Sequence, residues 1–336
     1  MTTPIASLSI AARATLNMHS LNNEGGEGNQ IQTRMVEVVD HTGELHSVNA
    51  VSGDMLKHVL MEHFFQLARA RHLDLCESCR GFNANRINAD RAFLTEMDKE
   101  KANDSQFIDQ MLMRCAIDDV AGVLVTESGK SIPRKSISEF GWVIGLPEKT
   151  RTESYLHVKY VSERSKDKRT EDASNQQKSG SNLGQSLFRR PASSGIYAIV
   201  CHLELARVGY NDIQQRYAIS SEKRRERATL LLESLLHTFI ELNGAMRSSQ
   251  LPHLVALDGV IATSESVLPA PMVSPLLGGD DSDAYKQQIS EIATALNGSG
   301  PEAVKTYNFN SISGFASQMR TLIDASSPFE LLQMSR

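Results

Sequence analysis

The segment from Leu8 to His19 constrains the fold of this chain most, because apolar side chains recur at every second position. One series of alternate positions is apolar throughout: Leu8, Ile10, Ala12, Ala14, Leu16 and Met18. The other series includes several hydrogen-bond donors: Arg13, Thr15, Asn17 and His19. Period two over this length predicts a β-strand with one face in a hydrophobic core.

Three further segments have strand patterns. Residues 195–207 are apolar on both faces, which predicts a central strand that is covered on both sides. Residues 254–262 predict another strand, and residues 35–39 predict a third, which a turn at residues 41–44 follows.

Two helices are predicted from apolar residues at helical spacing. The first covers residues 53–71, with Ser52 or Asp54 near its N-cap. The second covers residues 222–243 and ends at Gly244. Its first turns carry four basic residues, although the helix dipole favours acidic ones there: Lys223, Arg224, Arg225 and Arg227. These charges either form a solvated face or serve a partner.

The order of these elements predicts the fold class. Strand–helix units near both ends, separated by a long irregular middle, indicate an α+β fold with large insertions. Residues 265–283 are rich in Pro, Gly, Ser and Asp and are typical of a linker. Two short helices are expected after it, near residues 283–296 and 311–325.

Composition excludes some classes of protein. The 336 residues are 40% hydrophobic, which allows one large domain or two smaller ones, and the net charge of −5 excludes a histone-like binder. No apolar run approaches the roughly 18 residues of a membrane span, and residues 1–4 do not resemble a signal peptide. Four cysteines are too few for a disulfide framework in a chain of this length. A cytoplasmic protein is therefore expected, and no membrane partner is expected.

The charge is distributed unevenly. Residues 128–191 contain 13 Lys and Arg but only seven Asp and Glu. This surplus indicates either a polyanionic partner or a solvated, mobile hairpin. Residues 162–185 have almost no apolar side chains and are expected to form a flexible excursion.

A Gly- and Asn-rich loop is predicted at residues 21–29, where backbone amides can approach a ligand closely. Its glycine spacing is not that of a P-loop, and no Lys-Ser or Lys-Thr pair follows.

Two clusters contain residues that are suited to metal binding or catalysis. His72, Cys76 and Cys79 have the spacing of half a zinc site, and Cys115 is a candidate fourth ligand; the alternative is free thiols. Asp118 and Asp119 suggest a metal or acid–base pair, but adjacent strand residues point to opposite faces. No third carboxylate and no nucleophile elbow accompanies them, so catalysis is not supported.

Four motifs together resemble one family. The opening segment Ser7–Gly25 is similar to the first strand and loop of DevR-type CRISPR-associated proteins, the RAMP-superfamily backbone subunits of Cascade complexes. Gly53–His58, Cys115–Leu124 with Ile132–Ser136, and the basic helix ending in Asn243–Arg247 resemble further parts of that family.

The resemblance implies a fold and a division of the chain. An RRM-like (ferredoxin-like) palm would comprise residues 1–70 and 195–265, with a helical finger insertion at 71–150. A flexible basic β-hairpin thumb would comprise residues 151–194, and residues 266–336 would form a linker and short C-terminal helices.

It also implies a noncatalytic subunit that polymerises along the spacer of a guide RNA (crRNA). Such a subunit must hold any sequence, so it should contact phosphates and 2′-hydroxyls. Phe188 or Leu187, beside Arg189 and Arg190, is expected to wedge between bases. The candidate RNA-binding residues are Arg13, Asn17, His19, Asn22, Asn23, Gly25, Gly26, Asn29, Arg34, Lys57, His58, Arg134, Lys135, Ser136, Phe188, Arg189, Arg190, Gly244 and Arg247.

The implied partners are crRNA, copies of the same chain, an RNA-processing endonuclease, large or small Cascade subunits and the target DNA strand. Transposition proteins are a further partner class if the complex guides transposition. No cofactor is required, although structural zinc remains an option. Two alternatives stay open: a standalone RNA-processing nuclease using Asp118, Asp119 and His58, and a transcriptional regulator, for which no helix-turn-helix spacing is present.

Overall fold

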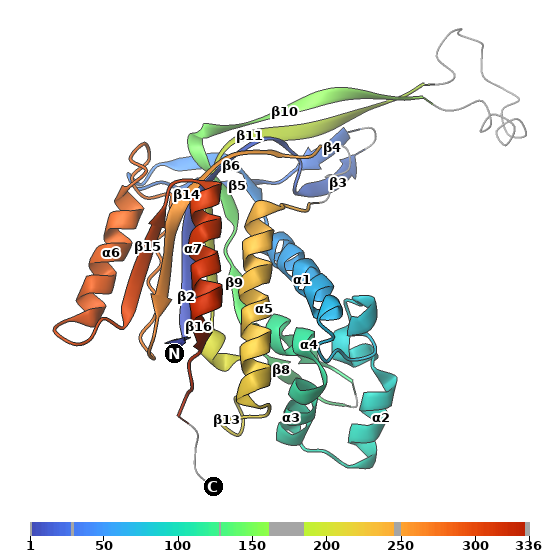
Figure 1. Cartoon of the computed structure of the whole chain (residues 1–336). Helices are drawn as coiled ribbons and strands as arrows, with labels where there is room; N and C mark the ends of the chain where they lie inside the picture. Colours follow the sequence, from blue (N-terminus) through green and yellow to red (C-terminus); the bar gives the residue numbers. More distant parts are fainter. Residues whose placement is uncertain (1, 28–29, 128, 161–184, 245–249, 333–336) are drawn as a thin grey trace, which may run out of the picture.

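The structure is a computed structural model that describes residues 2–27, 30–127, 129–160, 185–244 and 250–332. Its framework is a ten-stranded, mainly antiparallel sheet, whose continuous path runs β15-β14-β2-β11-β10-β6-β5. Helices cover this sheet (Figure 1). The predicted α+β class is confirmed at this level.

The centre of the sheet contains the three strands that the sequence predicts most clearly. β2 (Ser7–His19) lies between β11 (Gln185–Leu203) and β14 (His253–Ser264), and is antiparallel to both. The donor-bearing face of β2 is covered rather than solvated, because Ala11 packs in a small second core with Tyr285 and Ile289 of α6 (Ala284–Asn297). The period-two pattern therefore predicts the strand correctly but not the cover on its second face.

Three helices pack against the main core. α1 (Gly53–Ala70) contacts α5 (Ser221–Ile240), and α5 contacts α7 (Ile312–Ala325) (Figure 1). Each helix has a serine as its N-cap. The serine side chain accepts a hydrogen bond from a backbone amide of the first turn, which stabilises the helix N-terminus. The predicted helices at 53–71 and 222–243 are confirmed, although the second ends at Ile240.

Residues 71–142 form a mainly helical region beside α1 and α5 (Figure 1). Its apolar residues belong to the same core as the sheet. Asp118 and Asp119 lie on a short helix, so the expectation that they occupy a strand is wrong. The elements are η1 (Cys79–Gly81), η2 (Arg86–Ala89), α2 (Arg91–Lys99), α3 (Asp104–Arg114), α4 (Ala116–Ala121), β7 (Val123–Val125), β8 (Ile132–Arg134) and β9 (Ser138–Phe140).

A long hairpin of β10 (Val143–Tyr160) and β11 projects away from the rest of the chain (Figure 1). The pairing shifts register between Gly145 and Thr150. Glycine is needed there, because a Cβ on Gly195 would lie 2.3 Å from the Lys149 carbonyl oxygen. We call the part beyond this bulge, residues 150–160 and 185–195, the arm. The predicted excursion at 162–185 lies almost wholly outside the described residues.

A smaller hairpin lies beside the arm. β3 (Asn23–Glu27) pairs with β4 (Gln30–Thr33), and Gln30 pairs with Arg189 of β11. The predicted glycine-rich loop is therefore largely a hairpin. β5 (Met35–Val39) and β6 (Leu45–Val51) continue the sheet, as the strand at 35–39 and the turn after it predict.

The C-terminal region adds strands that the sequence does not predict. β15 (Val304–Phe309) forms a sheet edge against β14, and β16 (Ser326–Pro328) runs parallel to β1 (Thr3–Ile5). The two short helices predicted there are confirmed as α6 and α7. Residues 205–217 contain η4 (Leu205–Arg207), β12 (Tyr210–Asn211) and β13 (Arg216–Tyr217).

Candidate nucleic-acid interface

The arm carries a stack of aromatic and basic side chains. His157 and Phe188 face each other across the hairpin, with ring centroids 5.6 Å apart and planes inclined by 11°. The guanidinium of Arg190 lies 4.6 Å from the centre of the Phe188 ring. We call these three residues the arm stack. Aromatic rings and arginine side chains are the groups with which single-strand binders stack on bases and contact phosphates.

A second aromatic–cation pair lies near the base of the arm. The Arg34 guanidinium lies 5.0 Å from the ring of Trp142, which is 41% exposed. Asn49 accepts a hydrogen bond from the Tyr197 hydroxyl at 2.9 Å and donates to the Arg34 carbonyl at 3.0 Å. These bonds fix the edge from which Arg34 extends.

Lys57 and His58 line a cavity of about 300 Å³ between α1 and the loop before η2. Asn83 and Arg86 line it as well, and the His58 ring lies 5.5 Å from that of Phe82. Desolvation by burial, and then the nearby Arg86 charge, lower the pKa of Lys57. The Asp54 carboxylate also lines the cavity, and its charge and that of Glu139 oppose this lowering of the pKa. Two cations, an amide and an imidazole still offer an anion such as phosphate several hydrogen-bond donors.

Two residues of β2 are not available to RNA. Arg13 is only 5% exposed and donates to the Pro275 carbonyl at 2.8 and 3.0 Å, so it anchors the segment before α6. His19 is 2% exposed and packs edge-on against Tyr197; burial lowers its pKa to about 4. Both predicted RNA contacts are corrected here: the cover on the second face of β2 encloses Arg13, whereas a register shift turns His19 toward Tyr197 of the main core.

Arg134 is also structural. It is 4% exposed and binds Asp119 at 2.7 Å and the Tyr210 carbonyl at 2.8 Å. Arg227 binds the second oxygen of Asp119 at 2.9 Å. Two of the four basic residues in the first turns of α5 are thus buried inside the fold, because Arg227 binds Asp119 and Arg224 donates to the Val208 and Phe329 carbonyls.

The same network bears on the nuclease alternative. Asp118 and Asp119 are both 0% exposed, so neither carboxylate reaches a substrate. Lys135 is half exposed and pairs with Glu139 and Glu204, while the Ser136 hydroxyl donates to the Ser138 carbonyl at 2.7 Å.

The other predicted contacts are distributed along the arm side of the sheet. Asn17 is half-buried on β2, opposite His253, and the Asn22 side chain accepts the Ser52 amide at 3.4 Å. Gly244 packs so closely against Leu21 that a Cβ added at this position would lie 2.4 Å from a side-chain carbon of Leu21. The backbone of Asn23, Gly25 and Gly26 lies in β3, and Arg189 is exposed on β11. Asn29 and Arg247 lie outside the described residues.

Sequence reasoning missed several residues that complete these sites. They are His157, Trp142, Asn83 and Arg86. Trp142 is the only tryptophan of the chain and lies within the basic region, which was a usable signal. Nothing in the sequence paired His157 with Phe188, because the register of a hairpin with a long connection depends on its bulge.

Comparison with known proteins decides the family. The family described as "CRISPR-associated negative auto-regulator DevR/Csa2" matches residues 10–287. The chain belongs to the DevR/Csa2 family. The resemblance inferred from the opening strand, the first helix and the basic helix is thereby confirmed.

Curated relatives of this family are of similar length. The chain is 23% identical over 277 residues to "CRISPR-associated protein Cas7/Csa2 1" of Saccharolobus solfataricus, covering 80% of this chain and 82% of the relative. It is 27% identical over 278 residues to "CRISPR-associated protein Cas7/Cst2/DevR" of Methanocaldococcus jannaschii, covering 78% and 82%.

The fold is similar to that of a solved CRISPR protein chain. A chain of the structure "CRISPR RNA-guided surveillance complex, pre-nicking" matches with a TM-score of 0.55 and 12% identity, over 95% of this chain and all of that one. Within the described residues, no helix has both the length and the apolar character needed to cross a membrane.

Proposed function

We propose that this chain is a noncatalytic crRNA-binding backbone subunit of a type I CRISPR surveillance (Cascade) complex, polymerising along the spacer. Support comes from the family, whose relatives are named Cas7, and from the similarity of fold to a chain of an RNA-guided complex. The observation that carries the proposal is the arm stack, because it offers base stacking and a cation without reading base edges.

The proposed division of labour assigns a role to each part of the fold. The central sheet with α1 and α5 would be the RRM-like palm, residues 71–150 the finger, and the arm the thumb. A guide held by stacking and phosphate contacts leaves its base edges free to pair with a target DNA strand. Neighbouring copies, a processing endonuclease and large or small subunits would complete the complex, whether it leads to target degradation or to guide-directed transposition.

The nuclease alternative is disfavoured by the burial of Asp118 and Asp119. Incubation of labelled RNA with the purified chain and Mg²⁺ is expected to leave the RNA at full length. Cleavage that persists through purification and is lost in Asp119→Asn would contradict the noncatalytic proposal.

Binding is tested first on the protein purified alone. We expect an elevated ratio of absorbance at 260 to 280 nm, caused by co-purifying RNA that RNase removes. The protein and this RNA should form large oligomers that dissociate at high salt. The RNA should be trimmed to lengths that differ by a regular step. A clean monomer that does not bind single-stranded RNA at low salt would refute the proposal.

Phe188→Ala tests the arm stack. Loss of a stacked ring is expected to weaken RNA binding by about 1–3 kcal/mol, or roughly 5- to 150-fold, equally for unrelated sequences. Fluorescence anisotropy with labelled single strands measures the change. Leu156→Ala is the matched control, because Leu156 is 61% exposed and is adjacent to His157, so it points to the other face of the hairpin. Equal losses in both variants would argue against stacking on Phe188.

A further inference from the structure

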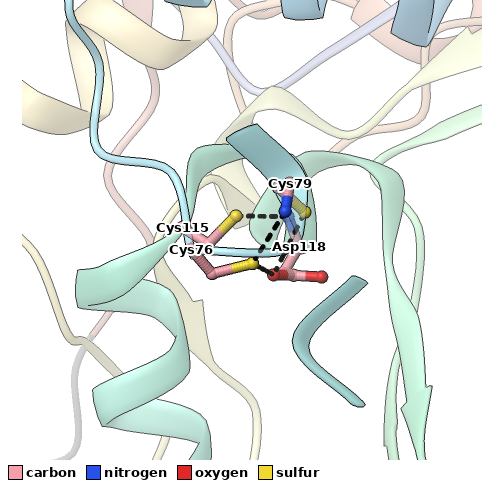
Figure 2. Close-up of side chains that lie close together, drawn as sticks. All are labelled: Cys76, Cys79, Cys115 and Asp118. Atoms are coloured by element: carbon pink, nitrogen blue, oxygen red, sulfur yellow. Dashed lines mark hydrogen bonds between the residues drawn. The ribbon is translucent and has the colours of Figure 1, made fainter. Parts of the chain in front are cut away.

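Three thiols and a carboxylate meet in the interior of the mainly helical region. The Sγ atoms of Cys76, Cys79 and Cys115 and a carboxylate oxygen of Asp118 all lie within 4.8 Å of one another. Figure 2 shows these side chains pointing toward one another. None of the four residues is more than 1% exposed. We call this group the thiol–Asp118 cluster.

The separations of the cluster fit the edges of a small tetrahedron. The Asp118 Oδ2 atom lies 3.4 Å from Cys76 Sγ and 3.7 Å from Cys79 Sγ. A tetrahedral Zn²⁺, with Zn–S of about 2.3 Å and Zn–O of about 2.0 Å, would separate its sulfur and oxygen ligands by about 3.5 Å. These two sulfur–oxygen separations therefore match a tetrahedral zinc site, and the Cys115 sulfur lies within 4.8 Å of all three other ligand atoms.

Backbone amides support the ligand atoms. The Cys79 amide donates to Cys76 Sγ at 3.4 Å, and the Asp118 amide donates to Cys115 Sγ at 3.5 Å. The Ile87 amide donates to the other Asp118 oxygen, Oδ1, at 3.3 Å and leaves Oδ2 directed at the sulfurs. Backbone amides that donate hydrogen bonds to metal ligands hold those ligands in position and stabilise the thiolate and carboxylate forms that bind a metal.

Charge distinguishes Asp118 from its neighbour. Asp119 is equally buried but is neutralised by Arg134 and Arg227. Among the described residues, no Lys or Arg forms an ion pair with Asp118. A buried carboxylate without a cation is costly, and a divalent metal would supply the missing positive charge.

We propose that Cys76, Cys79, Cys115 and Asp118 bind one structural zinc ion. Three thiolates and one carboxylate are ligands that Zn²⁺ accepts in a closed tetrahedral site. The ion joins the turn before η1 to the start of α4, and so fixes the path of the chain between α1 and the Asp119 network.

This ligand set corrects the one predicted from spacing. His72 is exposed and is absent from the cluster, although the sequence suggests it as the first ligand. Asp118 takes its place, because Cys115 and Asp118 are three residues apart on one helical turn and share a face.

The test uses the full chain produced with zinc in the medium. Elemental analysis is expected to give one zinc ion per chain after dialysis. Exchange with Co²⁺ is expected to produce thiolate-to-cobalt charge-transfer absorption together with the intense visible bands of a tetrahedral site. Wild-type protein that holds no zinc, and whose cobalt form lacks the charge-transfer band, would overturn the proposal.

Variants identify the ligands. Asp118→Asn and Cys115→Ser are expected to raise the zinc dissociation constant at least about tenfold, since losing even an outer-shell partner costs about 10- to 100-fold. Cys201→Ser is the matched control, as Cys201 is buried in β11 outside the cluster, and should keep one zinc. His72→Asn should also keep it, because Asn tolerates the left-handed backbone of that position. Zinc lost in His72→Asn but kept in Asp118→Asn would overturn the ligand set.

Discussion

At the scale of single residues, Lys57 is the cation whose surroundings best suit a phosphate. It lines a cavity with Asn83 and Arg86, and desolvation lowers its pKa because the charge has lost part of its hydration. An anion that enters the cavity adds to the counter-charge that Asp54 supplies there. The interaction should therefore depend on the RNA backbone and not on the base sequence.

Lys57→Ala is expected to weaken RNA binding by a similar factor for all sequences. The slope of log K against log salt should also flatten by about 0.7, the value for one phosphate contact on a single strand. Anisotropy titrations at several salt concentrations measure both effects. Lys99→Ala, which removes an exposed lysine of α2, is the control for net charge. A loss limited to particular sequences would argue against a phosphate contact.

His19 makes stability depend on pH. Burial lowers its pKa to about 4 from 6.5, so the unfolded chain binds this proton at a higher pH than the folded chain does. The contribution of His19 to the free energy of unfolding is fully present above pH 6.5. It is lost as the pH falls toward 4, which lowers the free energy of unfolding by up to about 3 kcal/mol.

Urea unfolding between pH 7.5 and 4.5 measures this dependence. His19→Phe should flatten the pH dependence, whereas His41→Asn, on an exposed turn, should keep the wild-type dependence. Equal pH dependence in His19→Phe and the wild type would show that other groups cause the loss.

At the scale of elements, buried Arg134 holds three of them together. It lies at the end of β8 and binds Asp119 of α4, which Arg227 of α5 also binds. The two arginines and the carboxylate are each at most 4% exposed. Removing one member leaves buried charge and carbonyl groups without partners.

Arg134→Ala is therefore expected to destabilise the fold by about 3–5 kcal/mol. Lys135→Ala is the adjacent control, because its exposed ion pairs should contribute no more than about 1 kcal/mol. Urea unfolding gives both values. A loss of RNA affinity in Arg134→Ala without loss of stability would restore Arg134 to the list of RNA contacts.

The sequence predicts elements better than it predicts sites. Period-two and helical patterns located β2, β11, β14, α1 and α5, because local burial determines those patterns. The roles of Arg13, His19 and Arg134 depend instead on segments more than 70 residues away, such as Pro275 and Tyr210. Residue type alone does not distinguish an arginine that binds carbonyls from one that binds phosphate.

At the scale of the whole molecule, the first and last described strands pair with each other. β1 and β16 pair in parallel, and the Phe329 amide donates to the Ile5 carbonyl at 2.9 Å. The buried Arg224 guanidinium donates to the Phe329 carbonyl at 2.7 Å. The C-terminal segment thus covers the first turns of α5 and stabilises the basic helix that the family resemblance includes.

Truncation after Ala325 is expected to destabilise the protein, because it removes β16 and the Phe329 acceptor of Arg224 together. Loss of the acceptor alone should cost about 1–3 kcal/mol. Thermal unfolding of the truncated chain is compared with that of Leu332→Ala, whose side chain is 96% exposed and should matter by less than about 0.5 kcal/mol. If residues 326–336 were only a tail, both variants would unfold like the wild type. A selective loss in the truncated chain would show that the first and last strands close a single cooperative fold, on which the arm and the Lys57 cavity are carried.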